Sequence, residues 1–164
     1  VPSLKPGTAA GAGYCGVRLR WEVPVDGETK SSVTPPPPVI DAARVICYAG
    51  TEVGVKFTDR LCLLVDGVRV GRVPRLVICQ NLCDPGDFLL LFCSENWESA
   101  GAIGSESVDL AKERAEVGYS GISSLWEYSR ANAEEVDEFV RREYGVDPKT
   151  KWWEIPGFTS EDEV

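Results

Sequence analysis

Short apolar runs separated by turn residues dominate the first two thirds of the chain. Residues 17–23, VRLRWEV, alternate apolar and charged positions, which is typical of a half-buried strand. Asp66-Gly67 predicts a two-residue hairpin turn, because glycine adopts positive φ at low cost. The continuous apolar run 88–93 predicts an interior strand that is covered on both faces. Further strands are expected at residues 44–48, 53–57, 61–65, 68–73 and 76–79.

Beyond residue 105 the apolar positions recur with the period of a helix. Ser107 is a favourable N-cap residue, and the residues after it form an apolar stripe. Together they predict a helix over about residues 107–118. Asn132 followed three positions later by Glu135 resembles a capping box and predicts a second helix over about 133–144. Strands followed by helices indicate an α+β fold. We expect a largely antiparallel sheet of about five to seven strands within residues 17–93, with both helices packed on one face.

The two ends of the chain contain few large apolar side chains that a core could bury. Residues 1–13 are rich in Gly, Ala and Pro and predict a flexible arm, and residues 159–164 predict an acidic tail. Between them we expect a single domain over residues 14–158, interrupted by a stiff loop at prolines 35–38. No apolar run approaches the roughly 20 residues that cross a bilayer, so we expect no membrane partner.

The formal net charge of −9 is concentrated in the C-terminal part of the chain. Residues 1–94 contain 10 Lys/Arg and 9 Asp/Glu, whereas residues 95–164 contain 7 and 17. Such a surface repels the phosphates of nucleic acid and favours a basic protein as partner. The alternative is that the acidity only keeps the protein soluble.

One glycine motif suggests nucleotide binding but lacks the required context. Residues 11–16, GAGYCG, have the spacing G-x-G-x-x-G, yet they lead into the strand at 17–23, whereas a dinucleotide site needs a helix there. The chain contains no histidine, which excludes His-based catalysis and His-ligated metals. We expect no cofactor, and no metal site is evident. An enzyme would depend on other groups, of which Cys93, Glu95 and Glu98 are the best candidates.

The six cysteines have three possible states. Four of them, at positions 47, 62, 79 and 93, fall within strand-like apolar runs, where a reduced thiol behaves as a small apolar side chain. Their even number would also permit disulfides, and Cys79 and Cys83 are close enough in sequence for a metal site. Buried free thiols, disulfides and a metal site therefore stay open.

Three consecutive pieces of the chain carry a resemblance: LLLFCSENWE at 89–98, SVDLAKERAE at 107–116 and YSGISSLW at 119–126. Their order of strand, acidic-Trp turn, Ala-rich helix, Tyr-x-Gly turn and Trp resembles small bacterial immunity or antitoxin-type proteins of toxin systems. The resemblance covers residues 88–128. It implies a non-catalytic binder that neutralises a cognate toxin by covering its active site.

We therefore expect a small, acidic, cytoplasmic inhibitor, similar to immunity proteins, that binds a basic protein through its helical C-terminal half. The candidate contact residues are carboxylates and two tryptophan anchors: Trp97, Glu98, Glu113, Glu116, Trp126, Glu134, Asp137 and Glu138. Two alternatives stay open. One is a histidine-free enzyme acting near residues 93–98, and the other is a structural or adaptor subunit.

Overall fold

The computed structural model describes residues 33–154. The arm at 1–13, the glycine motif at 11–16, the strand expected at 17–23 and the acidic tail lie outside these residues. The chain divides into two units after Thr34, beside the four prolines. The second unit, which begins at Pro35, is the one described below, and its residues 35–37 have no regular secondary structure.

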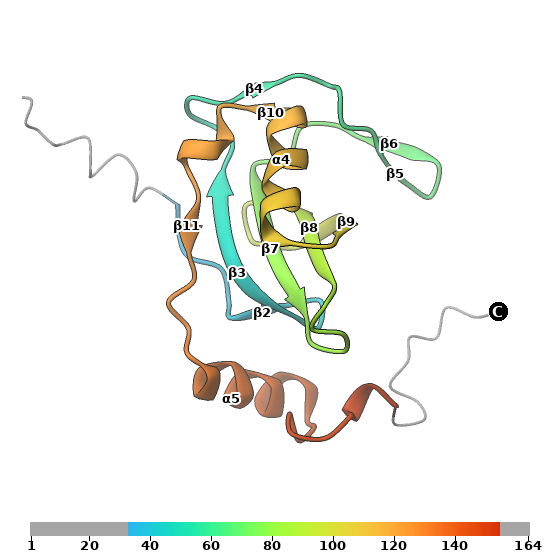
Figure 1. Cartoon of the computed structure of the whole chain (residues 1–164), viewed down its shortest axis with the longest axis vertical. Helices are drawn as coiled ribbons and strands as arrows, with labels where there is room; N and C mark the ends of the chain where they lie inside the picture. Colours follow the sequence, from blue (N-terminus) through green and yellow to red (C-terminus); the bar gives the residue numbers. More distant parts are fainter. Residues whose placement is uncertain (1–32, 155–164) are drawn as a thin grey trace, which may run out of the picture. The chain divides into compact units, whose positions relative to one another are not determined.

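An antiparallel sheet forms the centre of this unit, with the strand order β11–β3–β7–β8–β9 and with β2 paired to β3 off this path (Figure 1). The α+β fold with a largely antiparallel sheet and two C-terminal helices is confirmed. The strands of this sheet are β2 (Val39–Ile40), β3 (Ala43–Gly50), β7 (Arg75–Asn81), β8 (Phe88–Cys93), β9 (Ser99–Ser105) and β11 (Glu127–Tyr128).

The interior strands β7 and β8 follow directly from their apolar sequences. Leu76, Ile78 and Leu90 are all 0% exposed, and β8 lies between β7 and β9, which confirms the interior strand expected at 88–93. Asp84 closes the turn between these strands, because its carbonyl and carboxylate oxygens accept the N–H groups of Asp87 and Gly86. The core therefore lies over the middle of the sheet.

Several strands differ from the sequence-based expectation, which did not include β2, β9, β10 or β11. The run 53–57 contributes only β4 (Lys56–Phe57), which pairs with β10 (Tyr119–Ser120), while Val53 is 70% exposed. β9 was not expected as a strand, because its sequence SAGAIGS has weak β-propensity. It becomes one through pairing with β8. β11 likewise forms through pairing with β3.

The hairpin of β5 (Leu63–Val65) and β6 (Val68–Val70) is confirmed at Asp66-Gly67. Both turn residues have positive φ, 52° and 77°, as a type I′ turn requires. The hairpin packs over β9 at Gly101, where an added Cβ would lie 3.0 Å from atoms of Leu63 and Val65. Glycine at 101 thus permits the close approach of hairpin and sheet.

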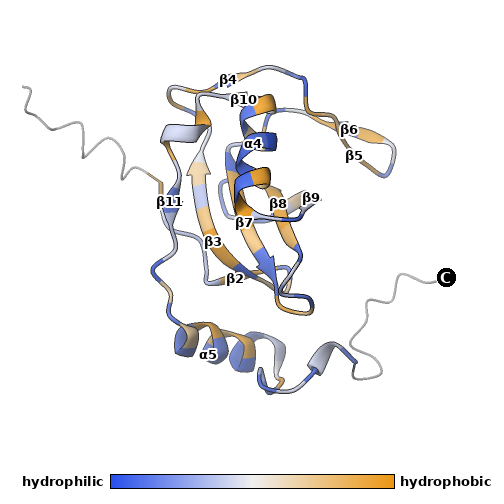
Figure 2. Cartoon of the chain, in the orientation of Figure 1, coloured by the Kyte–Doolittle hydropathy of each residue, from blue (hydrophilic) through white to orange (hydrophobic). Residues whose placement is uncertain are grey.

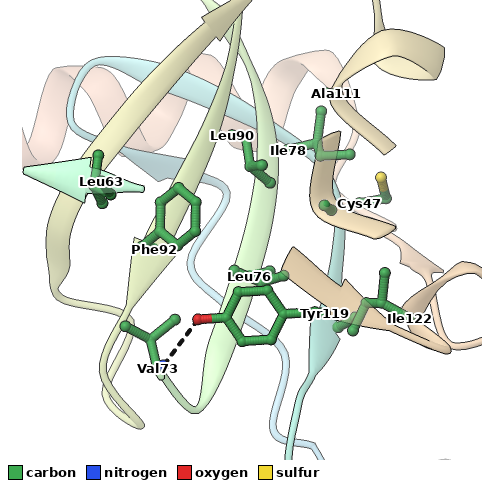
Figure 3. Close-up of a cluster of buried hydrophobic side chains, with 12 residues drawn as sticks. Cys47, Leu63, Val73, Leu76, Ile78, Leu90, Phe92, Ala111, Tyr119 and Ile122 are labelled. Atoms are coloured by element: carbon green, nitrogen blue, oxygen red, sulfur yellow. Dashed lines mark hydrogen bonds between the residues drawn. The ribbon is translucent and has the colours of Figure 1, made fainter. Parts of the chain in front are cut away.

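Helix α4 (Val108–Gly118) begins at the expected cap and covers one face of the sheet. The Ser107 side chain accepts a hydrogen bond from the Leu110 N–H. Ala111 and Ala115 are buried in the cluster shown in Figure 3, together with Tyr119, whose hydroxyl accepts the Val73 N–H at 3.0 Å. The 3-10 turn η1 (Ile122–Ser124) follows β10.

Helix α5 (Ala133–Tyr144) forms a separate cluster and does not share the α4 core. The Asn132–Glu135 capping box is present in both directions, and Gly145 ends the helix at φ 67°. Val136 and Val140 pack with Val39 of β2 and with Trp152 of η2 (Trp152–Glu154). Trp152 is 1% exposed, so the aromatic segment after α5 packs back against the helix.

Candidate protein-binding surface

The exposed face of α5 carries three of the candidate carboxylates. Glu134, Asp137 and Glu138 lie at positions i, i+3 and i+4, which places them on one side of the helix. Glu134 and Glu138 are exposed and Asp137 is half-buried. Within residues 33–154 none of the three forms an ion pair or a side-chain hydrogen bond. The hydrophilic side of the helix is visible in Figure 2.

The capping box explains why these carboxylates are available. The Glu135 carboxylate accepts a hydrogen bond from the Asn132 N–H at 2.8 Å. Because Glu135 completes the capping box, the other carboxylates of the first two turns are not needed to cap the helix. At the other end, Arg142 pairs with Glu143 at 2.8 Å. The first two turns of α5 therefore present negative charge, while both basic residues of the helix lie in its last turn.

The candidates on α4 have a different environment. Glu113 is exposed, but Lys112 and Arg114 flank it. Lys112 donates a hydrogen bond to the Tyr128 hydroxyl at 2.6 Å, which is the main cause of its raised pKa, and its ammonium lies 4.8 Å from the ring centroid. Sequence reasoning missed this contact because the two residues are 16 positions apart. The outer face of α4 is consequently mixed in charge.

Glu116 has a structural role in the turn that follows α4. Its carboxylate accepts the N–H of Gly121 at 2.8 Å and both the N–H and the hydroxyl of Ser123 at 3.0 and 2.7 Å. The hydrogen bond from Gly121 is the largest cause of its lowered pKa. The Glu116 carboxylate therefore holds the start of η1, and its role as a partner contact stays a prediction.

Trp97 is a core residue and not an exposed anchor. It is 7% exposed, its ring meets Tyr48 edge-on at 5.6 Å, and the guanidinium of Arg75 lies 5.9 Å from its centroid. Arg75 in turn pairs with Glu52 at 2.9 Å. The neighbouring Glu98 is exposed in the turn, where its N–H donates to the Ser94 hydroxyl.

Trp126 is half-buried against the core beneath α4. Its Nε1 is buried without a hydrogen-bond partner in the part of the chain that the structure describes. The eight candidates are thus divided among the α5 face (Glu134, Asp137 and Glu138), α4 (Glu113 and Glu116), the turn at Glu98 and the two tryptophan positions. The structure brings together the three carboxylates of α5 and does not join them with the tryptophans.

The cysteine chemistry required by the enzyme alternative is disfavoured by burial. Burial raises the pKa of the Cys93 thiol to about 12 and that of Cys47 to about 11, and it also raises the pKa of Cys79. These three thiols are protonated at neutral pH, so they are poor nucleophiles and poor metal ligands. All five cysteines between residues 33 and 154 are free, and Cys62, expected inside a strand, is exposed just before β5.

Among the described residues, no group of three or more Cys, Asp or Glu side chains is arranged to hold a metal ion. No helix within residues 33–154 has the length and apolar character to cross a membrane. The chain matches no family model, and no match was found among curated proteins or solved structures.

Proposed function

We propose that this protein is a non-catalytic inhibitor that binds a basic protein partner through the exposed face of α5. The observation that carries the proposal is the set of three carboxylates, Glu134, Asp137 and Glu138, that form no ion pair or side-chain hydrogen bond within residues 33–154. A charged side chain without an internal partner keeps its full capacity to bind an external cation. Basic side chains of a partner, above all Arg, supply the matching hydrogen-bond donors.

The capping and packing of α5 support a role in binding a partner. A capped helix packed through Val136, Val140 and Trp152 presents its carboxylates in a defined geometry, which lowers the entropy lost on binding. The net charge of −9 adds long-range attraction for a basic partner and speeds the encounter.

We infer the biological role from the resemblance at residues 88–128. A binder similar to immunity or antitoxin proteins would neutralise its toxin by occlusion, and toxins that act on nucleic acid are suitably basic. The free thiols of the described residues favour a reducing compartment, so we place the inhibitor in the cytoplasm.

Affinity capture from a lysate of the source organism, with the full chain as bait and a salt gradient for elution, tests the proposal. We expect a basic protein that elutes as the salt concentration rises, because screening weakens exposed charge pairs. The purified partner should then lose more than about tenfold in affinity for the triple variant Glu134→Gln/Asp137→Asn/Glu138→Gln.

A matched control distinguishes the α5 face from net charge alone. The triple variant Glu95→Gln/Glu106→Gln/Asp109→Asn removes the same amount of charge at exposed positions elsewhere. We expect it to bind nearly as well as the unmodified chain. Equal losses in the two triple variants, or a partner held equally at all salt concentrations, would refute recognition by the α5 face.

A further inference from the structure

The turn between β2 and β3 has a backbone conformation in which glycine is preferred, but it contains no glycine. The two strands pair up to Ile40 and Ala43, so Asp41 and Ala42 form a two-residue turn. Both turn residues have positive φ, 48° and 57°, as in a type I′ turn. Residues with a Cβ atom adopt this left-handed region at a cost in free energy, and aspartate tolerates it better than alanine. The strain is therefore greatest at Ala42.

The β5–β6 hairpin supplies an internal comparison. Its turn, Asp66-Gly67, is of the same type, with φ 52° and 77°. Aspartate occupies the first position in both turns, whereas the second position is Gly67 in one and Ala42 in the other. A Cβ atom added at Gly67 would meet no atom within 4 Å among the described residues beyond its chain neighbours, so glycine serves only the backbone conformation there. Ala42 adopts the same conformation without that advantage.

Contacts with α5 and with the segment after β7 hold Ala42 in this conformation. Its N–H donates a hydrogen bond at 3.2 Å to the hydroxyl of Tyr144, the last residue of α5. Its carbonyl accepts the Leu82 N–H, also at 3.2 Å. Its side chain packs against the cluster around Val136 and Val140. A strained residue persists only where its surroundings fix its conformation, and these contacts do so for Ala42.

Tyr144 joins this turn to the rest of the α5 cluster. Its ring stacks on Trp152, with centroids 5.7 Å apart and an interplanar angle of 12°, and meets Phe139 edge-on at 6.5 Å. Strand β2 belongs to the same cluster through Val39, which is 2% exposed. Because β2 is only two residues long, its pairing with β3 depends on this apolar contact as well as on backbone hydrogen bonds. The turn, β2 and α5, which lie at the same end of the sheet in Figure 1, are therefore linked.

We propose that the Asp41-Ala42 turn is a strained clip, which lowers the free energy needed to undock α5 and makes β2 leave the sheet together with it. With α5 docked, Tyr144 and Leu82 hold Ala42 in the left-handed region. When α5 undocks, Ala42 loses the Tyr144 hydroxyl and Val39 loses its apolar cover, so β2 separates from β3 and the turn relaxes to negative φ. The strain is present only in the docked state, and it therefore raises the population of the undocked state.

Of the two helices, the clip controls α5 alone. Helix α4 packs in a different cluster, which contains no residue of β2 or of the Asp41-Ala42 turn. The sheet beneath α4 can therefore stay closed while α5 and β2 open. The proposal concerns the movement of α5 and not what its carboxylates bind, so it does not depend on the proposed function.

Amide hydrogen exchange of the full chain, measured residue by residue, tests the clip. The Val140 amide lies inside α5 and reports on the helix. The Val45 amide donates to the Pro38 carbonyl and reports on β2, and the Leu82 amide donates to the Ala42 carbonyl and reports on the turn. In the unmodified chain we expect these three amides to exchange at similar, intermediate rates, faster than the amide of Ala115 in α4.

Two substitutions should move these rates in opposite directions. Ala42→Gly should slow exchange at all three reporter amides by about threefold, because the relief of strain exceeds the loss of one methyl contact and the added freedom of glycine in the open state. Tyr144→Phe should speed exchange at the same amides by about fivefold, because it removes the acceptor of the Ala42 N–H. Exchange at Ala115 should not change in either variant.

Gly67→Ala is the matched control, since it introduces the same strain into the turn of the β5–β6 hairpin. It should speed exchange in that hairpin and leave Val140, Val45 and Leu82 as they are. Unchanged or faster exchange at Val140 in the Ala42→Gly variant would overturn the clip. A change at Val140 without a parallel change at Val45 and Leu82 would overturn the joint opening of α5 and β2.

Discussion

The helices α4 and α5 are similar in length but are held in place in different ways. α4 rests through Ala111 and Ala115 on a sheet whose Leu76, Ile78 and Leu90 are fully buried. α5 depends on its capping box and on a small cluster formed by Val136, Val140, Val39 and Trp152. The difference indicates that α4 shares the stability of the sheet, whereas α5 can open by itself at a lower free-energy cost. This suits α5 for recognition and α4 for the core.

The largest expected effect is on the core beneath α4. Leu90→Ala should lower the free energy of unfolding by about 4 kcal/mol, because it leaves a cavity among side chains that cannot collapse around it. Chemical denaturation followed by circular dichroism measures this loss. Sheet and helix signals should change together. A loss below about 1 kcal/mol would mean that this core relaxes easily.

A weaker and local effect is expected in the α5 cluster. Val140→Ala should cost about 2 kcal/mol, because it removes two buried methyl groups. Amide hydrogen exchange should accelerate in α5 and remain unchanged in α4. Equal acceleration in both helices would show that they unfold as one unit and would remove the proposed difference between them.

The two N-caps provide a matched pair of substitutions. Ser107→Ala and Asn132→Ala each remove a side-chain acceptor from a helix terminus and should cost about 1 kcal/mol. In α4 the loss should appear as reduced global stability, while in α5 it should appear as faster local exchange. Denaturation and hydrogen exchange on both variants measure the two responses. The comparison fails if the Asn132→Ala variant lowers global stability as much as Ser107→Ala.

The smallest effect is expected at Glu116, and it depends on pH. Its pKa is lowered from 4.5, so the carboxylate stabilises the fold above this value and loses that contribution as the pH falls through the folded pKa. Glu116→Gln should cost roughly 1 kcal/mol or less at pH 7, because the carboxylate is largely solvent exposed. The difference in stability from the unmodified chain should shrink below about pH 4. Glu113→Gln, at an exposed carboxylate without these hydrogen bonds, is the control.

Local signals predicted the two helices and the strands β3, β5, β6, β7 and β8. The Asp66-Gly67 turn, the Ser107 cap, the Asn132–Glu135 box and the apolar run of β8 each act over a few residues, so the sequence was sufficient. β9 was missed because its residues have weak strand propensity and are ordered by β8. The candidate surface was predicted in part. Exposed carboxylates on α5 follow from helical periodicity, while the contacts of Glu116 depend on the fold of the next turn.

What the sequence determined by itself was the class of fold, the helix boundaries and the excess of negative charge, because these depend on composition and on neighbours along the chain. The tertiary structure decided which charged and aromatic groups remain available. Trp97 is enclosed by Tyr48 and Arg75, and Glu116 is engaged by Gly121 and Ser123. Whether a side chain is free to bind a partner depends on which segments pack against it. The residue pattern of a single helix or turn carries no information about segments that are distant in the sequence.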